Sequence, residues 1–141
     1  PEMSRGLGDV YKRQPLDLAE TVRRCAYLYE GLTAAGIPVI RMGLQPDEDL
    51  RAPGRILAGP FHPSFGELVH SYVWQKKIDA LIAEQKSGNY NMVITVPDRL
   101  SSIVRGQHRS NIRHWEASGR IKVQVEAGCQ FEVTFHDQKM V

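Results

Sequence analysis

The apolar positions of the first third of the chain repeat with a helical period. They run from Leu18 to Leu32, and Asp17 and Glu20 stand in the capping-box arrangement ahead of them. Gly36 suits the left-handed residue that commonly follows a helix. The pattern predicts an amphipathic helix over this stretch.

Two more segments follow the predicted helix. Ile37–Met42 is continuously apolar at its centre, which is typical of a strand buried on both faces. After a Gly- and Pro-rich loop over 43–63, Ser64 opens a second capping box and helical spacing continues to Lys86. A single helix-strand pair cannot close a sheet, so the strand requires partner strands outside this segment.

The last third alternates in a different order, β-α-loop-α-β-β, in which we expect the last two strands to form a hairpin. The fold class is therefore α/β (α+β). The expected elements are a strand over Met92–Val96, helices over Leu100–Arg105 and Ser110–Ser118 around a loop at 106–109, and strands over Ile121–Val125 and Phe131–Phe135.

Composition narrows the functional classes. Hydrophobic residues make up 42% of the chain and charged residues 24%, as in ordinary soluble domains. No apolar run approaches the roughly 20 residues of a membrane span, and nothing resembles a secretory signal. Two cysteines far apart in sequence form neither a disulfide framework nor a metal-ligand spacing. We expect a cytoplasmic protein without membrane contact.

Positive charge is concentrated in one stretch. The net charge is only +2, but Asp98–Lys122 holds six basic and two acidic residues, which leaves about −2 for the rest. Such segregation favours phosphate binding. His108 and His114 lie in the same stretch, but six residues on a helix phase them poorly for a shared metal ion.

The loop Gly106-Gln107-His108-Arg109 lies between the two short predicted helices, and an Asn-Ile pair begins the second. This order resembles the KH module of RNA-binding proteins, in which a GxxG loop joins two helices. The resemblance implies that the loop approaches a nucleic-acid backbone and that the next helix offers free N–H groups to phosphate. Arg109 replaces the second glycine, so its guanidinium either blocks that approach or contacts phosphate itself.

The RNA interpretation assigns phosphate contacts to the basic residues and loop shape to the glycine. The alternative is a small α/β domain whose basic helix face is merely solvated. The candidate nucleic-acid-binding residues are Arg105, Gly106, Gln107, His108, Arg109, Arg113 and Lys122.

A second resemblance is carried by two stretches, Val39-Ile-Arg-Met-Gly-Leu-Gln-Pro46 and Ala58-Gly-Pro-Phe-His-Pro-Ser-Phe-Gly-Glu-Leu-Val69. They look like the C-terminal region of radical-SAM proteins related to elongator subunit 3 and the oxygen-independent coproporphyrinogen oxidases. The resemblance implies the last helix and strand of an incomplete barrel, and KH-like modules end such chains. It covers nearly everything after residue 14.

The resemblance implies a division of the chain into successive parts. The first fourteen residues resemble a translated sequencing adapter, so we expect the protein proper to be truncated there. The expected parts are a foreign or disordered tail over 1–14, the barrel end and loop over 15–63, a connecting helix over 64–88, a KH-like module over 89–136 and a tail over 137–141.

The chemistry of the radical-SAM family requires a CxxxCxxC run whose thiolates hold a [4Fe-4S] cluster with one iron open for S-adenosylmethionine. This chain has no such run. The cluster and S-adenosylmethionine are therefore expected in the parent enzyme, and the chain itself is not expected to be an enzyme. Its expected partners are the missing N-terminal radical-SAM domain and RNA.

Three polar residues lie near the expected barrel mouth: Arg41, Gln45 and His62. Arg41 and Gln45 either face a substrate or cofactor or find partners within the protein. For His62 we favour a rigid Pro-Phe-His-Pro turn in which the ring caps backbone groups. The resulting hypothesis is an accessory region that positions a tRNA-like RNA; the alternative is a purely structural domain that covers the barrel without binding nucleic acid.

Overall fold

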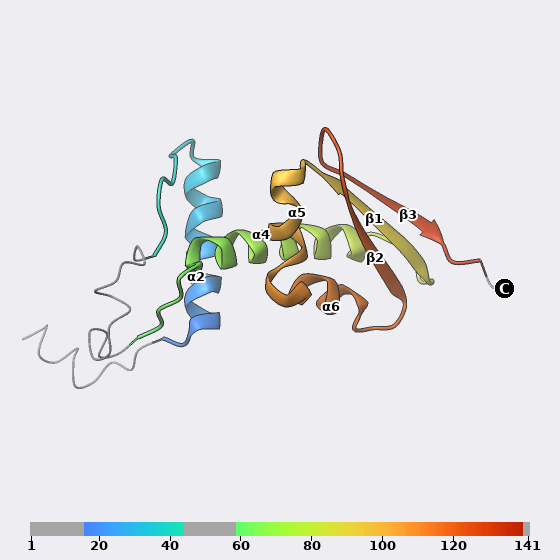
Figure 1. Cartoon of the computed structure of the whole chain (residues 1–141), viewed down its shortest axis with the longest axis horizontal. Helices are drawn as coiled ribbons and strands as arrows, with labels where there is room; N and C mark the ends of the chain where they lie inside the picture. The colour runs from blue at the N-terminus through green and yellow to red at the C-terminus, as the bar shows by residue number, and fades with distance from the viewer. Residues whose placement is uncertain (1–15, 44–58, 140–141) are drawn as a thin grey trace, which may run out of the picture. The chain divides into compact units, whose positions relative to one another are not determined.

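The computed structural model describes residues 16–43 and 59–139, in which four α-helices accompany a three-stranded mixed sheet (Figure 1). The chain divides into two compact units, Pro1–Phe65 and Gly66–Val141, here called unit 1 and unit 2. The elements are α2 (Leu18–Ala34), α4 (Phe65–Ala83), β1 (Tyr90–Val96), α5 (Asp98–Arg105), the 3₁₀ turn η1 (Gln107–Arg109), α6 (Ser110–Glu116), β2 (Ile121–Ala127) and β3 (Glu132–Asp137).

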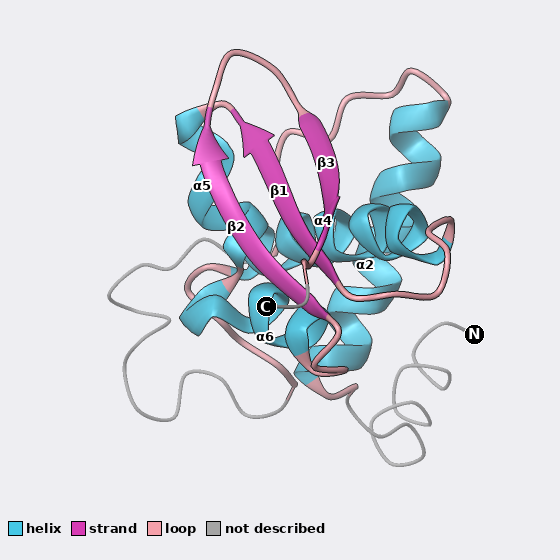
Figure 2. Cartoon of the chain, turned by 90° about the vertical axis from the view of Figure 1, so that its right-hand side faces the viewer, coloured by secondary structure: helices cyan, strands magenta, loops and turns pink. Residues whose placement is uncertain are grey.

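The sheet of unit 2 has the strand order β2-β1-β3 (Figure 2). β1 pairs with β2 in parallel, with Met92 opposite Val123, and with β3 in antiparallel, with Met92 opposite Phe135. The β-α-α-β order predicted for the last third is confirmed. The expected terminal hairpin is wrong, because β2 and β3 occupy opposite edges of β1 and do not pair with each other.

The central place of β1 follows from its side chains. Met92, Ile94 and Val96 are completely buried, whereas β2 and β3 are exposed along much of their length. A strand that contributes this much apolar surface is most stable with both edges paired and one face covered. The four-residue connection from β2 to β3 therefore crosses the end of β1, where the Gly128 N–H donates to the Val96 carbonyl at 2.9 Å.

The core of unit 2 lies on one face of the sheet. Ile78 of α4, Val104 of α5 and Ile112 of α6 are buried against the three β1 residues, together with Trp115. Among the described residues, these three helices lie on the same side of the sheet (Figure 2), and the other face carries polar side chains from all three strands. α4 thus contributes side chains to the core of unit 2.

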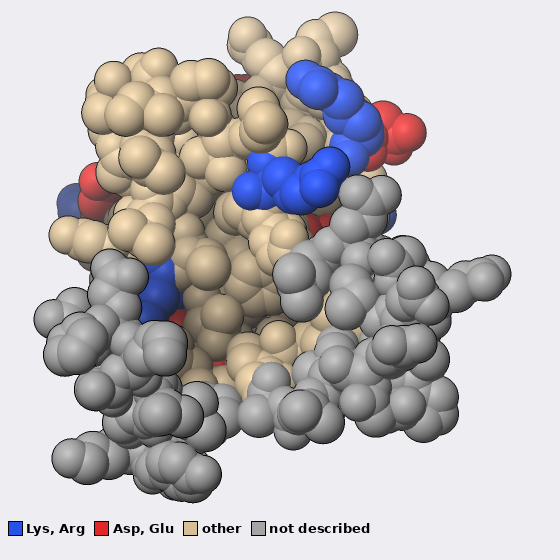
Figure 3. Space-filling view, turned by 90° about the vertical axis from the view of Figure 1, so that its left-hand side faces the viewer, with Lys and Arg blue, Asp and Glu red and all other residues tan. Residues whose placement is uncertain are grey.

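Unit 1 carries the uncovered apolar surface of the described chain. The structure assigns no strand to residues 37–42; Ile40 is 96% exposed and Ile37 51% exposed, so the expected buried strand is wrong for this chain. Its backbone finds no neighbouring strand among the described residues, and without a ladder the segment cannot bury both faces. Uncharged side chains also dominate the described surface seen in Figure 3.

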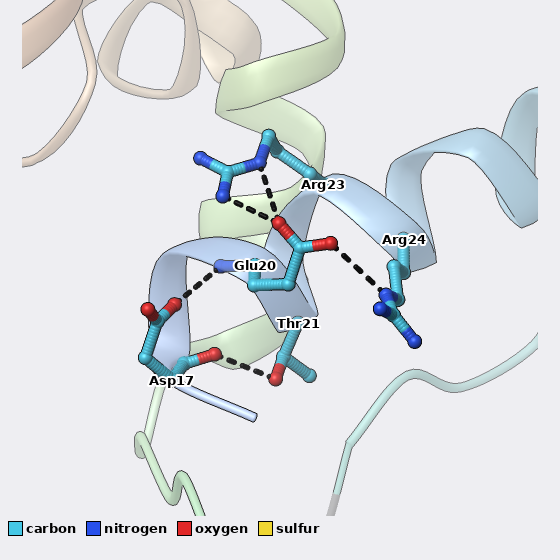
Figure 4. A network of polar contacts seen from close by, with 5 residues as sticks. All are labelled: Asp17, Glu20, Thr21, Arg23 and Arg24. Atoms are coloured by element: carbon cyan, nitrogen blue, oxygen red, sulfur yellow. Dashed lines mark hydrogen bonds and ion pairs between the residues drawn. The ribbon is translucent and has the colours of Figure 1, made fainter. Parts of the chain in front are cut away.

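The first turn of α2 confirms the predicted start of the helix. The Asp17 side chain accepts from the Glu20 N–H at 2.7 Å, and the Thr21 hydroxyl donates to the Asp17 carbonyl (Figure 4). Hydrogen bonds from Arg23, and then from Arg24, lower the pKa of the Glu20 carboxyl. The Asp17 side chain thus satisfies an N–H group of the first turn of α2, and the Glu20–Arg23 and Glu20–Arg24 pairs stabilise the helix further.

None of the described helices combines the length and apolar character that crossing a bilayer requires.

Candidate nucleic-acid interface

The loop between α5 and α6 has an unusual backbone. Gly106 adopts φ 79° and ψ 162°, and His108 and Arg109 both adopt left-handed conformations with φ of 53° and 59°. Consecutive non-glycine residues in this region cost energy that the surrounding contacts have to offset. The loop is therefore held in place by specific interactions.

Two sets of hydrogen bonds supply that support. The Gly106 N–H donates to the Ser102 carbonyl at 3.0 Å, and the Arg109 N–H donates to the Gly106 carbonyl at 3.1 Å. The Arg113 guanidinium donates to the His108 carbonyl. Arg113 thus fastens the outer part of the loop to α6.

Gly106 is buried, although the KH resemblance implies that the loop glycine lies against nucleic acid. A Cβ atom at this position would overlap the Ser110 Oγ and lie 3.0 Å from the Asn111 nitrogen. The absence of a side chain is thus needed for contacts inside the protein. The structure places the exposed surface of the loop at His108 and Arg109.

The arginine of the loop, Arg109, and the two on the flanking helices, Arg105 and Arg113, differ in their surroundings. Arg105 is half-buried and donates to the Val125 carbonyl of β2 at 3.1 Å, while Arg109 and Arg113 are exposed. None of the three forms an ion pair with a carboxylate of the described residues. Glu116, the closest acid in sequence, accepts instead from the Val123 N–H at 2.9 Å. The positive charge of the loop therefore remains uncompensated by acidic side chains in the described part of the chain.

Two features that the resemblance implies, phosphate binding by the N-terminus of α6 and by Lys122, receive little support from the structure. α6 has only seven residues and no side-chain cap, so its N-terminal dipole is small. Lys122 follows Ile121, which belongs to the core, and strand side chains alternate. Lys122 therefore lies on the polar face of the sheet, whereas the loop belongs to the helical layer. Of the other basic residues, Arg109 belongs to the loop and Arg113 contacts it, whereas the Arg105 guanidinium reaches β2.

Asn111 has a role that sequence reasoning missed. It is only 3% exposed, and its amide nitrogen donates to the Ser71 carbonyl of α4 at 2.9 Å and to the Val104 carbonyl of α5 at 3.0 Å. Ser71 is also buried, and its hydroxyl donates to the Ile103 carbonyl at 2.8 Å. This buried polar cluster joins three helices behind the loop. Its only signal in the sequence is the Asn-Ile pair that begins the second short helix.

A second group of candidate residues lies in unit 1. The His62 Nδ1 accepts from the Ser64 N–H at 3.0 Å, so the ring caps a backbone group, as the turn interpretation predicts. His62 and Arg41 line two hollows of about 220 and 250 Å³ that share Cys25 and Gly43. Gln45 lies outside the described residues.

A metal centre finds no support in the described part of the chain. No group of three His, Cys, Asp or Glu side chains there could hold a metal ion. The whole sequence has two cysteines, Cys25 in unit 1 and Cys129 in unit 2, so three thiolates for a [4Fe-4S] cluster are not present.

Comparison with known proteins identifies one region. Residues 7–75 match the family model of the radical-SAM C-terminal domain. No curated protein and no solved structure matches the chain significantly. The expected radical-SAM C-terminal region is thus confirmed for residues 15–75, and the match begins at residue 7, inside the stretch that was expected to be foreign. This family implies a cluster and S-adenosylmethionine in the parent enzyme, and the donor set of this chain does not fit that cluster.

Proposed function

We propose that this chain is the C-terminal accessory region of a radical-SAM enzyme of the elongator-subunit-3-like or coproporphyrinogen-oxidase-like group, and that its KH-like module positions a tRNA-like RNA. The chemistry belongs to the N-terminal radical-SAM domain of the parent. The single observation that carries the proposal is the uncompensated positive charge around the loop, where Arg109 and Arg113 are exposed and Arg105 is anchored behind them.

Arg109 and His108 of the loop and Arg113 of α6 would contact the RNA in different ways. Arg109 presents a guanidinium that contacts phosphate oxygens through two parallel hydrogen bonds. Arg113 holds the His108 carbonyl and adds its charge, and His108 offers a ring beside them. Such contacts fix where an RNA lies without reading its bases. Affinity would therefore depend strongly on salt and weakly on sequence.

Reversing one exposed charge tests this proposal. We expect Arg109→Glu to weaken binding of a structured tRNA by about tenfold or more at low salt, and to reduce the slope of log affinity against log salt by about one. Filter binding over a salt series measures both. Arg109 is the best position because its side chain makes none of the hydrogen bonds that hold the loop.

Lys122→Glu is the matched control, with the same change in charge on the other face of the sheet. We expect it to cost far less affinity than Arg109→Glu, and circular dichroism should show both variants folded. Unchanged tRNA binding by Arg109→Glu would exclude the loop as the interface. Equal losses in the two variants would mean that only overall charge matters.

A second candidate function is purely structural, and the exposed apolar residues of unit 1 favour it. Tyr27 is 77% exposed and Leu28 60% exposed on α2, and Ile40 is almost fully exposed in the segment that follows. An apolar surface of this kind is typical of a protein interface. In this interpretation unit 1 packs on the radical-SAM barrel of the parent, and residues 37–42 add to the edge of its sheet.

Co-purification with the separately expressed barrel domain of the parent tests this second candidate. We expect Ile40→Asp to abolish co-purification, because it buries an unpaired carboxylate in the proposed interface. Thr33→Asp, an exposed polar position at the end of α2, should leave it intact. Retention of the barrel by Ile40→Asp would eliminate residues 37–42 as the docking segment.

A further inference from the structure

Unit 2 contains a hollow of about 320 Å³ that the proposed RNA contact does not use. It lies where α4 ends and where β1 and β2 begin. Its volume is at the lower end of the range for small-molecule sites. The residues that line it are Ile82, Ala83, Gln85, Lys86, Gly88, Tyr90, Ser118, Arg120 and Ile121.

Tyr90 organises the two basic residues of the hollow. Its N–H donates to the Arg120 carbonyl at 2.8 Å, and its hydroxyl donates to the Lys86 carbonyl at 2.8 Å. The Arg120 Nε donates to the Gly88 carbonyl at 3.3 Å, which uses one of the five donors of the guanidinium. The backbones of both cationic residues are therefore fixed before any ligand arrives, and the orientation of the guanidinium is restricted.

The charged residues that line the hollow are both basic. Lys86 and Arg120 contribute two positive charges, and none of the lining residues is acidic. The C-terminus of α4 adds a partial negative charge of about one half, which two full charges outweigh. A phosphomonoester carries about −1.5 to −2 at neutral pH, so it balances the two cations better than a carboxylate or a phosphodiester does.

The wall of the hollow complements an apolar body attached to that phosphate. Ile121 is 9% exposed, and Ile82 and the Tyr90 ring are half-buried beside it. Tyr90 is itself held by an edge-to-face contact with Phe135 at 6.2 Å between ring centroids. A flat ring resting on these side chains would remove apolar surface from water while the phosphate meets the cations.

We propose that this hollow binds a phosphomonoester carried on a flat, partly apolar body of nucleotide size. The same chemistry is offered by a free 5′-mononucleotide and by the 5′-phosphorylated terminal nucleotide of an RNA. The site is separate from the proposed function, because none of its residues belongs to the loop of residues 106–109. Failure of one proposal therefore leaves the other standing.

Nuclear magnetic resonance titration of the full 141-residue chain with 5′-AMP, adenosine and inorganic phosphate tests the site. We expect 5′-AMP to bind best and to shift the backbone amides of Lys86, Gly88, Tyr90 and Ile121. Arg120→Ala and Lys86→Ala should each weaken 5′-AMP binding by about tenfold, the usual effect of losing a charge-assisted contact. Arg99→Ala, an exposed arginine of α5, is the matched control and should bind as the wild type does.

The variants also separate this site from the RNA contact at the loop. Arg109→Glu should retain 5′-AMP binding even if it loses tRNA. Equal binding of adenosine and 5′-AMP, or unchanged binding in both Lys86→Ala and Arg120→Ala, would overturn the proposal. A preference for a 5′-phosphorylated over a 5′-hydroxyl oligonucleotide assigns the ligand to an RNA end, and equal binding of the two assigns it to a free mononucleotide.

Discussion

Replacing Asn111 by leucine is expected to lower the free energy of unfolding of unit 2 by about 3 kcal/mol, because a buried side chain loses two hydrogen bonds and an apolar group then faces two carbonyl oxygens. The amide nitrogen of Asn111 donates to the Ser71 and Val104 carbonyls at 2.9 and 3.0 Å. Leucine has the same branched skeleton of four side-chain heavy atoms, with bulkier methyl groups in place of the amide oxygen and nitrogen, so both hydrogen bonds disappear while the branching is kept. Urea denaturation followed by circular dichroism measures the effect as a lower midpoint with an unchanged slope.

Two further variants decide whether the hydrogen bonds of Asn111 are responsible. Asn91→Leu changes an exposed asparagine on the polar face of the sheet and should alter stability by less than about 0.5 kcal/mol. Ser71→Ala removes only the hydroxyl bond to the Ile103 carbonyl and should cost about 1 kcal/mol. A denaturation midpoint of Asn111→Leu equal to that of the wild type would show that the buried cluster does not hold the three helices together.

The sequence indicated Asn111 but not its role. An Asn-Ile pair at the start of a short helix was readable as part of a KH-like pattern. The partners of Asn111 lie 40 and 7 residues earlier, on two other helices. A long-range contact of this kind leaves no periodic signal, because periodicity reports which face of one element is apolar and not which polar atom meets another.

For the strands too, the position in the sequence was predictable, whereas the pairing between strands was not. The strand around Met92–Val96 was predictable because its apolar run and the following Pro97 are local features. The positions of its neighbours were not, since two strands separated by a short turn normally form a hairpin. Here the helices α5 and α6 carry the chain back parallel to β1, and β3 then occupies the free edge of that strand.

The apolar run of residues 37–42 and the family resemblance both predict a buried strand, and the error has a physical cause. An apolar segment is stabilised when it is buried, but its own sequence does not show whether another surface is present to cover it. Within this chain that surface is not present among the described residues, and Ile40 remains exposed. The proposed packing of unit 1 on a barrel would bury the apolar side chains of residues 37–42.

The sequence predicts that the basic residues form a charged cluster, but it does not predict which of them is free to contact phosphate. Arg105 and Arg113 both donate to backbone carbonyls, so part of their capacity is used to hold β2 and the loop. Arg109 could be distinguished from them only once those bonds were known. Lys122 belonged to the same charged stretch in sequence, yet strand alternation places it on the other face of the sheet.

Replacing Gly106 by alanine is expected to cost about 3 kcal/mol of stability, because φ 79° with ψ 162° lies in a region that only glycine adopts readily and because the new methyl group overlaps the Ser110 side chain. Gly119→Ala is the matched control in the same unit: φ is 71° there, but nothing lies within 4 Å of the added Cβ. It should cost only about 1 kcal/mol. Urea denaturation of both variants measures the difference.

The overlap with Ser110 can be isolated by a double-mutant cycle. Ser110→Ala removes the Oγ that the new methyl group meets, so Gly106→Ala should cost less in that background than alone. The relief is partial, since the Asn111 nitrogen at 3.0 Å and the backbone conformation stay as they are. Equal costs for Gly106→Ala and Gly119→Ala would show that the close contacts do not matter. Because Gly106 is needed inside the protein, a loss of RNA binding in a Gly106 variant would report a damaged loop, and only a surface change such as Arg109→Glu tests the interface itself.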